Sequence, residues 1–439
     1  MILQKLPRLG NPGEPLRLLV DFAQMILDLW QRCLSERYHA PIYYLASLIR
    51  YTLDLNATAV APHIIPSLIP VCTTTCRLVA QPRYYSPDGN LASHPDNVIR
   101  QLSYDIDVTQ ILALLHLAAL GCVVPNAPSL NAAGGADVAP PQHSPQVEFW
   151  RTIEPDFVLM MLSPKHPERD WLAIIGLLWS SVLPASVGPI PTKVSMAALG
   201  RGDSKRTEAE DLAEVSTGVI SRVSSFLVDM PGWAPRGSVK ELKVRFNALR
   251  TLEIFATSPY GAAQLARHDL AIPRVVTAWS WAINCMYDVD GGLPKKPTSK
   301  SDKSESKKTV DGDAMDVDTA EPPRDEDETD WPGGDGEEQD EGVQLFAQLP
   351  EFISEATFFL HTLITNPLTA GIIGNITEKL ASYLGASQRY LLTLARLTAG
   401  EDELILDAMI PVETSELAAE LFKMVVNMDD AHAIQDAFN

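Results

Sequence analysis

The sequence contains none of the short motifs that mark the common enzyme classes. A Gly-x-x-x-x-Gly-Lys-Ser/Thr phosphate loop, a Gly-x-Gly-x-x-Gly after a strand, a Gly-x-Ser-x-Gly elbow and a His-Glu-x-x-His zinc motif are all absent. The nine histidines do not cluster, and the run that begins at His166 fits a helix start better than a metal site. We therefore expect no catalytic residue, no cofactor and no metal, although a site built from distant residues would leave no such motif.

Cysteine is scarce and irregularly spaced. The five cysteines show no disulfide framework, which is typical of reduced thiols in an intracellular protein. Cys72 and Cys76 lie one helical turn apart, and a metal site there would need two further ligands, of which His63 is the one candidate close in sequence. We expect both thiols to pack in the core.

Basic residues are outnumbered, with 35 Lys and Arg against 56 Asp and Glu and a net charge of −21. This balance excludes a broad phosphate-binding face and argues against sequence-specific nucleic-acid binding, although Lys240, Lys243 and Arg245 could form a local basic patch. The first fifteen residues lack a continuous apolar run, so no signal peptide is expected. The most apolar run, 171–183, is too short for a bilayer, so no membrane partner is expected.

Strand signals are also absent, because no Asn-Gly or Asp-Gly turn joins two alternating runs. Apolar residues instead recur every three or four positions, which predicts helices. The expected helices are 15–38, 41–53, 62–78, 106–123, 149–162, 168–183, 208–228, 238–255, 258–267, 269–288, 346–365, 371–384, 387–399 and 415–428. A capping box of Ser238 and Glu241 should open one of them. Such helices predict an all-α, HEAT/armadillo-like α-solenoid.

A charged insert interrupts this pattern at 291–342. Its first part holds six Lys against two acids, and from 309 onward it holds fifteen acids against Arg324 alone. Such a segment cannot bury enough apolar surface to offset its ordering entropy, so we expect disorder. The predicted domains are a flexible start at 1–14, a helical-repeat body at 15–290 with loops near 125–145 and 188–203, the insert, and a C-terminal helical region at 343–439 that continues the solenoid.

The insert also contains two lysine pairs. Lys295 and Lys296 are separated by ten residues from Lys307 and Lys308, which resembles a two-part nuclear import signal with a weak second cluster. The alternative is a plain solvated linker. The import interpretation predicts a nuclear protein.

The C-terminal tail has its own pattern. Leu404 and Leu406 flank an acidic turn, and Leu417, Leu421 and Met424 recur on one face of the helix that follows. One interpretation is a terminal helix that caps the solenoid, and the other is a helix that docks into the groove of a partner.

The run at 402–408, followed by the helix at 416–425, resembles the C-terminal region of the fungal branch of the ATRIP family, and the preceding helices resemble that family's HEAT-like body. The resemblance implies a non-catalytic DNA-damage checkpoint scaffold that binds an ATR-class kinase through its helical repeats and C-terminal helix. Family members also carry an N-terminal arm for the single-strand-DNA-binding protein RPA and a dimerising coiled coil. No heptad run precedes residue 15, so RPA binding is expected only if a missing arm exists, and homodimer formation stays open. The alternative function is a HEAT-like adaptor for another nuclear assembly, in transport or kinase maturation.

Overall fold

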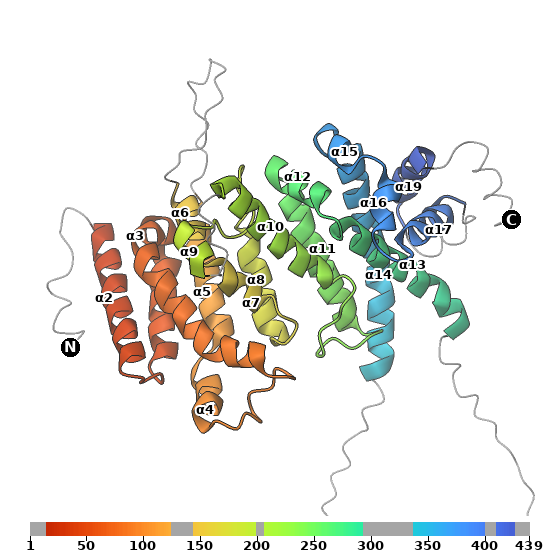
Figure 1. The fold of residues 1–439 in the computed structure, drawn as a ribbon. Coiled ribbons are helices and arrows are strands. Elements are labelled where there is room, and N and C mark those ends of the chain that lie inside the picture. The colour runs from red at the N-terminus through yellow and green to blue at the C-terminus, as the bar shows by residue number, and fades with distance from the viewer. Residues whose placement is uncertain (1–14, 124–143, 199–205, 293–336, 400–409, 426–439) are drawn as a thin grey trace, which may run out of the picture.

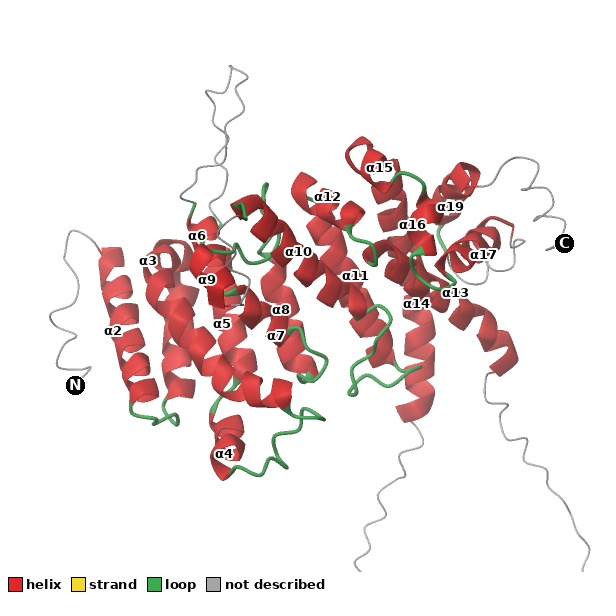
Figure 2. Cartoon of the chain, viewed as in Figure 1, coloured by secondary structure: helices red, strands yellow, loops and turns green. Residues whose placement is uncertain are grey.

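The computed structural model describes residues 15–123, 144–198, 206–292, 337–399 and 410–425. Within these ranges every regular element is a helix, and the β-type pairing is limited to an isolated bridge between Leu183 and Ser186 (Figure 2). In chain order the helices are α2 (Pro15–Ser35), α3 (Ile42–Tyr85), α4 (Asn97–Asp105), α5 (Val108–Gly121), α6 (Pro145–Thr152), α7 (Pro155–Met161), α8 (Glu168–Trp179), α9 (Lys193–Ala198), α10 (Glu208–Ser225), α11 (Val239–Ala256), α12 (Pro259–Arg267), α13 (Ala271–Gly292), α14 (Glu337–Thr365), α15 (Pro367–Ile373), α16 (Ile376–Ala381), α17 (Ala386–Ala399) and α19 (Val412–Val425).

The helices stack into an elongated body, with α2 at one end and α17 and α19 at the other (Figure 1). One row runs through the stack by nearest-neighbour packing: α3 contacts α2 and α5, α5 contacts α8, α8 contacts α11, α11 contacts α14, and α14 contacts α19. A second row packs α10 on α13 and α13 on α17. Contacts between successive helices are the signature of a solenoid, so the predicted all-α helical-repeat fold is confirmed.

A continuous apolar core fills the space between the rows. Buried aromatic side chains provide much of its volume, and several indoles also hold a hydrogen bond across helices. Trp30 Nε1 donates to Thr75 Oγ1 at 3.0 Å, and Trp150 Nε1 donates to the Ser180 carbonyl at 3.0 Å. These bonds satisfy the polar atom of a side chain that is otherwise buried in hydrocarbon.

Cys72 and Cys76 lie fully buried in the core, as the sequence predicted. Burial raises the pKa of both thiols above the usual value, which keeps them protonated and unreactive. Among the residues that the structure describes, no three His, Cys, Asp or Glu side chains come together as a metal site.

Helix α3 is one element with a sharp kink at Asn56, whose φ of −164° and ψ of 79° are not helical. The Asn56 Oδ1 accepts a hydrogen bond from the Ala59 N–H at 3.1 Å, so this side chain caps the second half of the helix. The expected helix start at Pro62 is therefore wrong, since the helix begins before it. By length and composition alone α3 could cross a bilayer, but its apolar core residues pack against α2 and α5.

The capping prediction for α11 is half correct. Ser238 Oγ accepts from the Glu241 N–H at 3.2 Å, but the Glu241 carboxylate turns to the Gly237 N–H at 2.6 Å and to Arg245. Arg245 is buried, and its guanidinium lies 4.1 Å from the centre of the Trp281 ring. The expected basic patch of Lys240, Lys243 and Arg245 does not form. Arg245 is buried and pairs with Glu241, and Lys243 pairs with Glu168 at 2.9 Å.

Helices α13 and α14 flank the predicted insert and pack directly on each other. Residues 293–336 lie outside the described ranges, while α13 ends at Gly292 and α14 begins at Glu337, so helix extends into both ends of the predicted segment. The same stack therefore continues from one side of the insert to the other, because α13 and α14 are neighbours in it (Figure 1).

Candidate partner-binding surfaces

Helix α19 turns much of its apolar face into the body. Leu421 and Ala418 are fully buried against α14 and α17, whereas Leu417 is half-buried and Met424 is 57% exposed. The terminal-capping interpretation accounts for Leu421, which no partner can reach in this arrangement. Whether Leu417 and Met424 contact a partner stays a prediction.

Polar contacts fix α19 in place. Ser415 Oγ donates to the Leu397 carbonyl of α17 at 2.9 Å, and Thr414 Oγ1 donates to Ser354 Oγ of α14 at 2.9 Å. Its exposed positions carry Glu413, Glu416, Glu420 and a single base, Lys423, and Glu420 contacts His361 Nε2 at 2.7 Å. The accessible side of this helix is therefore acidic with a few apolar side chains, which suits a partner with a basic rim better than an apolar groove.

The other predicted site residues, Leu404, Leu406 and the four lysines Lys295, Lys296, Lys307 and Lys308, lie outside the described residues. Their assigned roles therefore stay predictions.

A groove of about 1140 Å³ lies at the C-terminal end of α3. Its walls are the last turns of α3, the connection that follows it and the first turns of α4, with Arg77, Tyr85, His94 and Ile99 among the lining side chains. The sequence analysis missed this groove and predicted neither α4 nor the fold of the connection. The signal that could have found it is Asp96, which caps α4 by accepting from the Val98 N–H at 2.8 Å.

Hydrogen bonds from Lys165, which is distant in sequence, and bonds within the connection itself hold the segment that forms the groove. Lys165 Nζ donates to the carbonyls of Tyr84 and Ser86 at 3.0 and 2.7 Å, which caps the end of α3. Gly89 has a φ of +72°, and a Cβ there would lie 2.5 Å from the Lys165 carbonyl oxygen, so only glycine fits. Asp88 Oδ1 accepts from Asn90 N–H and from Ser86 Oγ, and these bonds lower the pKa of Asp88.

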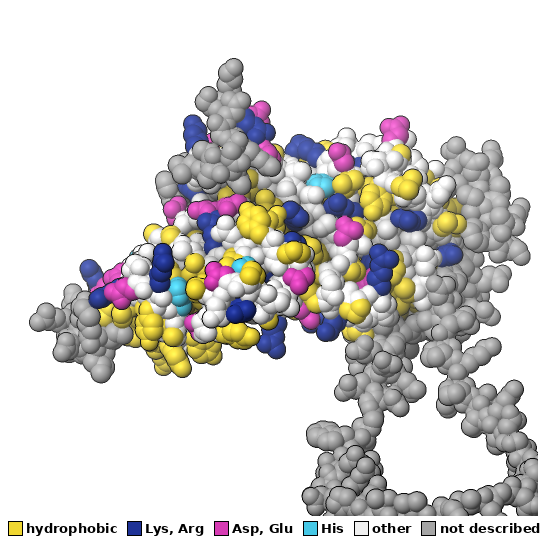
Figure 3. Space-filling view, turned by 60° about the horizontal axis from the view of Figure 1, so that its bottom comes forward, with side chains coloured by type: hydrophobic (Ala, Val, Ile, Leu, Met, Phe, Trp, Pro, Cys, Tyr) yellow, Lys and Arg dark blue, Asp and Glu magenta, His cyan; other side chains and the backbone are white. Residues whose placement is uncertain are grey.

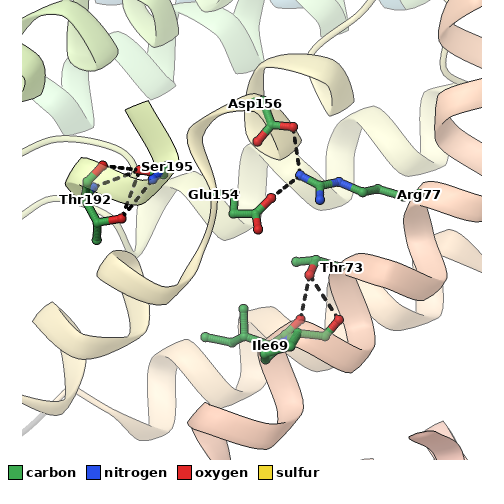
Figure 4. Close-up of polar contacts among 8 residues, drawn as sticks. Ile69, Thr73, Arg77, Glu154, Asp156, Thr192 and Ser195 are labelled. Carbon is green, nitrogen blue, oxygen red and sulfur yellow. Dashed lines mark hydrogen bonds and ion pairs between the residues drawn. The ribbon is translucent and has the colours of Figure 1, made fainter. Parts of the chain in front are cut away.

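Arg77 joins the groove to the neighbouring α7. Figure 4 shows its guanidinium between two carboxylates: it donates to Asp156 Oδ2 at 2.8 Å and also contacts Glu154. The same group lies 6.0 Å from the centre of the Phe157 ring. Because two carboxylates share the Arg77 guanidinium, its positive charge is already compensated. The ion pairs position α7 against α3 and make the guanidinium a poor binding group for an anionic ligand.

Two titratable side chains of the groove are engaged with the backbone of the connection. His94 Nδ1 accepts from the Asp96 N–H at 3.1 Å, and the Asp88 carboxylate is used by its own turn. Asp88 and His94 thus hold the backbone of the connection. The lining surface of the groove is mainly apolar, with polar side chains such as Gln81, Asn90 and His94 among its residues, a mixture typical of binding pockets.

Comparison with known proteins gives two family matches. Residues 71–364 match the model described as Rad26-like, helical repeats, and residues 374–438 match Rad26-like, C-terminal domain. The groove belongs to the first region and α19 to the second. A search of curated proteins found no match.

A solved structure is also similar. It is the crystal structure of Myceliophthora thermophila Rad26 (residues 373–841), with 45% sequence identity and a TM-score of 0.76. The match covers 97% of this chain and 91% of that one.

These findings correct the family named from the sequence. The run at 402–408, the helix at 416–425 and the preceding repeats predicted the fungal branch of the ATRIP family. The matching models and the solved structure instead all carry the name Rad26. Because the repeat model covers more than half of the residues, and because the solved Rad26 is 45% identical over 97% of them, this chain belongs to the Rad26-like family.

Proposed function

We propose that this chain is a non-catalytic checkpoint scaffold that binds and supports an ATR-class kinase. The observation that carries the proposal is the match to the Rad26-like family along both the repeats and the C-terminal domain. A partner of this kind needs a long rigid surface, and a stack of helices with a continuous core supplies one.

The site geometry supports a binding role. In the groove at the end of α3, Asp88 and His94 are engaged with the backbone, and the exposed side of α19 offers Met424 near acidic residues. We place the kinase contact on the helical repeats and the C-terminal helix, with Met424 as an apolar contact on α19 that a partner can reach.

Affinity purification of the tagged whole chain followed by mass spectrometry tests the proposal. An ATR-class kinase should be the dominant partner, and recovery of a transport or maturation assembly without that kinase would overturn the proposal.

Removal of 401–439 should abolish recovery of the kinase, but this deletion also uncovers α14 and α17. The variant Met424→Glu, on an exposed position, keeps the fold and should weaken the kinase interaction about tenfold. Unchanged recovery with both variants would exclude the C-terminal helix.

We further propose that the lysine pairs of the insert direct the protein to the nucleus. Alanine at Lys295, Lys296, Lys307 and Lys308 should shift a fluorescent fusion from the nucleus to the cytoplasm. The matched control replaces Lys300 and Lys303, which lie in the same segment but outside both pairs. Equal nuclear signal for all three proteins would contradict the import role.

A further inference from the structure

Two neighbouring helices near the C-terminal end carry basic residues and no acid along most of their length. Residues 270–287, which span most of α13, and 379–400, which include α17, contain four Lys and Arg and no Asp or Glu. In the whole chain acids outnumber bases, 56 to 35. The two helices pack on each other, and Figure 3 shows Lys and Arg side chains among hydrophobic ones over the C-terminal helices on one face of the molecule. This part of the body is therefore an exception to the acidic balance of the chain.

The structure brings these basic side chains into a row between α13 and α17. Arg389 Nη1 of α17 donates to Thr277 Oγ1 of α13 at 3.3 Å, and two turns further along Arg396 contacts Asn284. Helix α16 packs against the same side of α13, where it adds a lysine. We call this row the α13–α17 basic stripe, and its members are Arg274, Lys379, Arg389 and Arg396, all of them half-buried. Partial burial restricts these side chains while their charged groups stay within reach of a ligand.

Neutral groups accept the hydrogen bonds of two arginines in the stripe. Arg274 Nη1 donates to the Ser221 carbonyl at 2.8 Å and to Ser224 Oγ at 2.9 Å, and the acceptor for Arg389 is the Thr277 hydroxyl. A carbonyl or hydroxyl orients a guanidinium but carries no charge of its own. The positive charges of Arg274 and Arg389 are therefore not neutralised by these bonds, and an anionic segment can form the stronger charge-assisted bonds with them.

The acids at the edge of the stripe compensate its charge only in part. Asp229 lies near Arg274, and Asp269 lies near Lys379. Burial nevertheless lowers the pKa of Arg274 and the pKa of Lys379, which means that the loss of water around each cation outweighs the attraction of the nearby acid. Additional negative charge at the stripe would therefore stabilise both cations.

An acidic peptide fits the stripe better than a single-stranded nucleic acid. Proteins that bind single strands stack bases on accessible aromatic rings. Trp281 of α13 is half-buried, and the Arg245 guanidinium lies over its ring at 4.1 Å from the ring centre. Leu392 lies between Arg389 and Arg396 on α17 and is 48% exposed, so it offers an apolar contact beside the charges. Such a surface suits a peptide that carries several carboxylates and an occasional apolar side chain.

The chain itself contains a segment of this chemistry. Residues 309–336 hold eleven acids against Arg324 and one tryptophan, and they begin sixteen residues after the end of α13. Sixteen residues can span up to about 55 Å, whereas the helix from Gly292 back to Arg274 is only about 27 Å long. We propose that the α13–α17 basic stripe binds the acidic segment 309–336 of the same chain. A partner that presents an acidic segment to the stripe must then displace this one.

The connection to α13 determines how fully the stripe is occupied. A few separated charge pairs in water give a weak contact, for which we expect a Kd on the order of 100 μM. A tether of this length supplies an effective concentration on the order of 1 mM. The acidic segment should therefore occupy the stripe about nine-tenths of the time at low salt, and added salt should release it.

Fluorescence anisotropy with a labelled synthetic peptide of residues 320–336 tests the proposal. The first protein is a shortened chain in which about twelve Gly and Ser residues replace 297–332, and it should bind the peptide with a Kd on the order of 100 μM at low salt. The whole chain should bind the peptide about tenfold more weakly, because its own acidic segment competes. A peptide in which Asn and Gln replace the acids should not bind to either protein.

Variants of the shortened chain locate the binding surface. Lys379→Gln combined with Arg389→Gln should weaken peptide binding about fivefold, whereas Arg389→Lys keeps the charge and should stay within about twofold. The matched control, Arg169→Gln combined with Lys240→Gln, removes the same charge from exposed positions on α8 and α11 and should leave Kd unchanged. Circular dichroism of each variant verifies the fold, and the comparison of whole and shortened chains decides even if the stripe variant fails to fold.

Three results would overturn the proposal. Equal affinity of the whole and shortened chains would show that the tethered segment leaves the stripe unoccupied. An equal loss in the control pair would show that the peptide responds to net charge and not to the stripe. Tighter binding of a labelled oligothymidine than of the peptide, lost in the stripe variant, would assign the stripe to nucleic acid instead.

Discussion

At the scale of single residues, two buried histidines are held neutral by the fold. His166 Nε2 contacts the Met160 carbonyl at 3.1 Å, and burial lowers its pKa to about 4. His268 Nδ1 accepts from the N–H groups of Leu270 and Ala271 at 3.1 and 3.0 Å, which caps the start of α13. Burial, with Arg274 nearby, lowers the pKa of His268 to about 4 as well. Protonation of that ring would remove the acceptor of both capping bonds.

These histidines should make the fold sensitive to mild acid. In the unfolded chain a histidine titrates near pH 6.5, so between about pH 6.5 and 4 the unfolded state binds more protons and stability falls with falling pH. Each group contributes up to about 1.4 kcal/mol per pH unit in that window. Urea unfolding at pH 7.5 and 5.0 measures the loss, and His268→Asn, which keeps an acceptor but does not titrate, should reduce it. An equal loss in this variant would exclude His268 as a source.

Glu253 on α11 acts in the opposite direction. Burial and the neighbouring Glu355 raise its pKa to about 7, and its Oε1 has no hydrogen-bond partner among the described residues. Folding therefore favours the protonated acid, and the stability it contributes is lost as pH rises from about 4.5 through 7.

The variant Glu253→Gln should thus raise the free energy of unfolding by about 1–2 kcal/mol at pH 8 and change it little at pH 5. Thermal melts at both pH values measure the difference. Glu351→Gln, an exposed contact of the same Arg250, serves as the control and should show no such pH-dependent gain. A destabilised Glu253→Gln protein at pH 8 would contradict the burial argument.

At the scale of elements, α3 accommodates three of its prolines on a side that is partly open to water, after a helix start that Asn56 caps. Pro62, Pro66 and Pro70 recur every fourth residue, so they share one side of the helix, and this side is at least partly open to water. Water can bond to the carbonyls that proline leaves without a donor, which reduces the cost of each break in the hydrogen-bond ladder. Asn56 then supplies the helix start that Pro62 was expected to supply.

Loss of this cap should be measurable. Asn56→Ala removes the acceptor for the Ala59 N–H and should cost about 1 kcal/mol, whereas Asn56→Asp keeps a capping oxygen and should be near neutral. Guanidinium unfolding of the three proteins provides the comparison. Equal midpoints for Asn56→Ala and the unchanged chain would show that the kink is set by packing alone.

Periodicity predicted the existence of most helices but misplaced several ends. The expected helix at 149–162 is two helices, because Pro155 opens α7 after a break. The expected helix at 371–384 is also divided, since Gly374 has a φ of +62° and Asn375 caps α16. The spacing of apolar residues does not reveal such caps. It also does not indicate which of two apolar faces of a helix is buried. For that reason the expected helix at 41–53 carried no distinction between its buried and exposed apolar residues, and the groove beside α4 had no counterpart in the sequence analysis.

At the scale of the whole molecule, the body behaves as one stack across the insert. Arg250 of α11 pairs with Glu355 of α14 at 3.0 Å, and Phe246 contacts Phe352 with ring centres 5.9 Å apart. These contacts join helices on either side of 293–336 without using that segment.

Replacement of 297–332 by about twelve Gly and Ser residues should therefore leave the fold intact. The helical circular dichroism signal per helical residue should be unchanged, and Tm should stay within about 2 °C. Cooperative unfolding is the measurement that decides, because a second transition in the shortened protein would show that the segment joins two separate units.

The adjacency of α13 and α14 also makes this the natural place to add sequence. A foreign domain whose own termini lie close together, such as a fluorescent protein, can be spliced between these helices without interrupting the order of the stack. The same geometry lets the length of this segment change without altering the packing of the two helices.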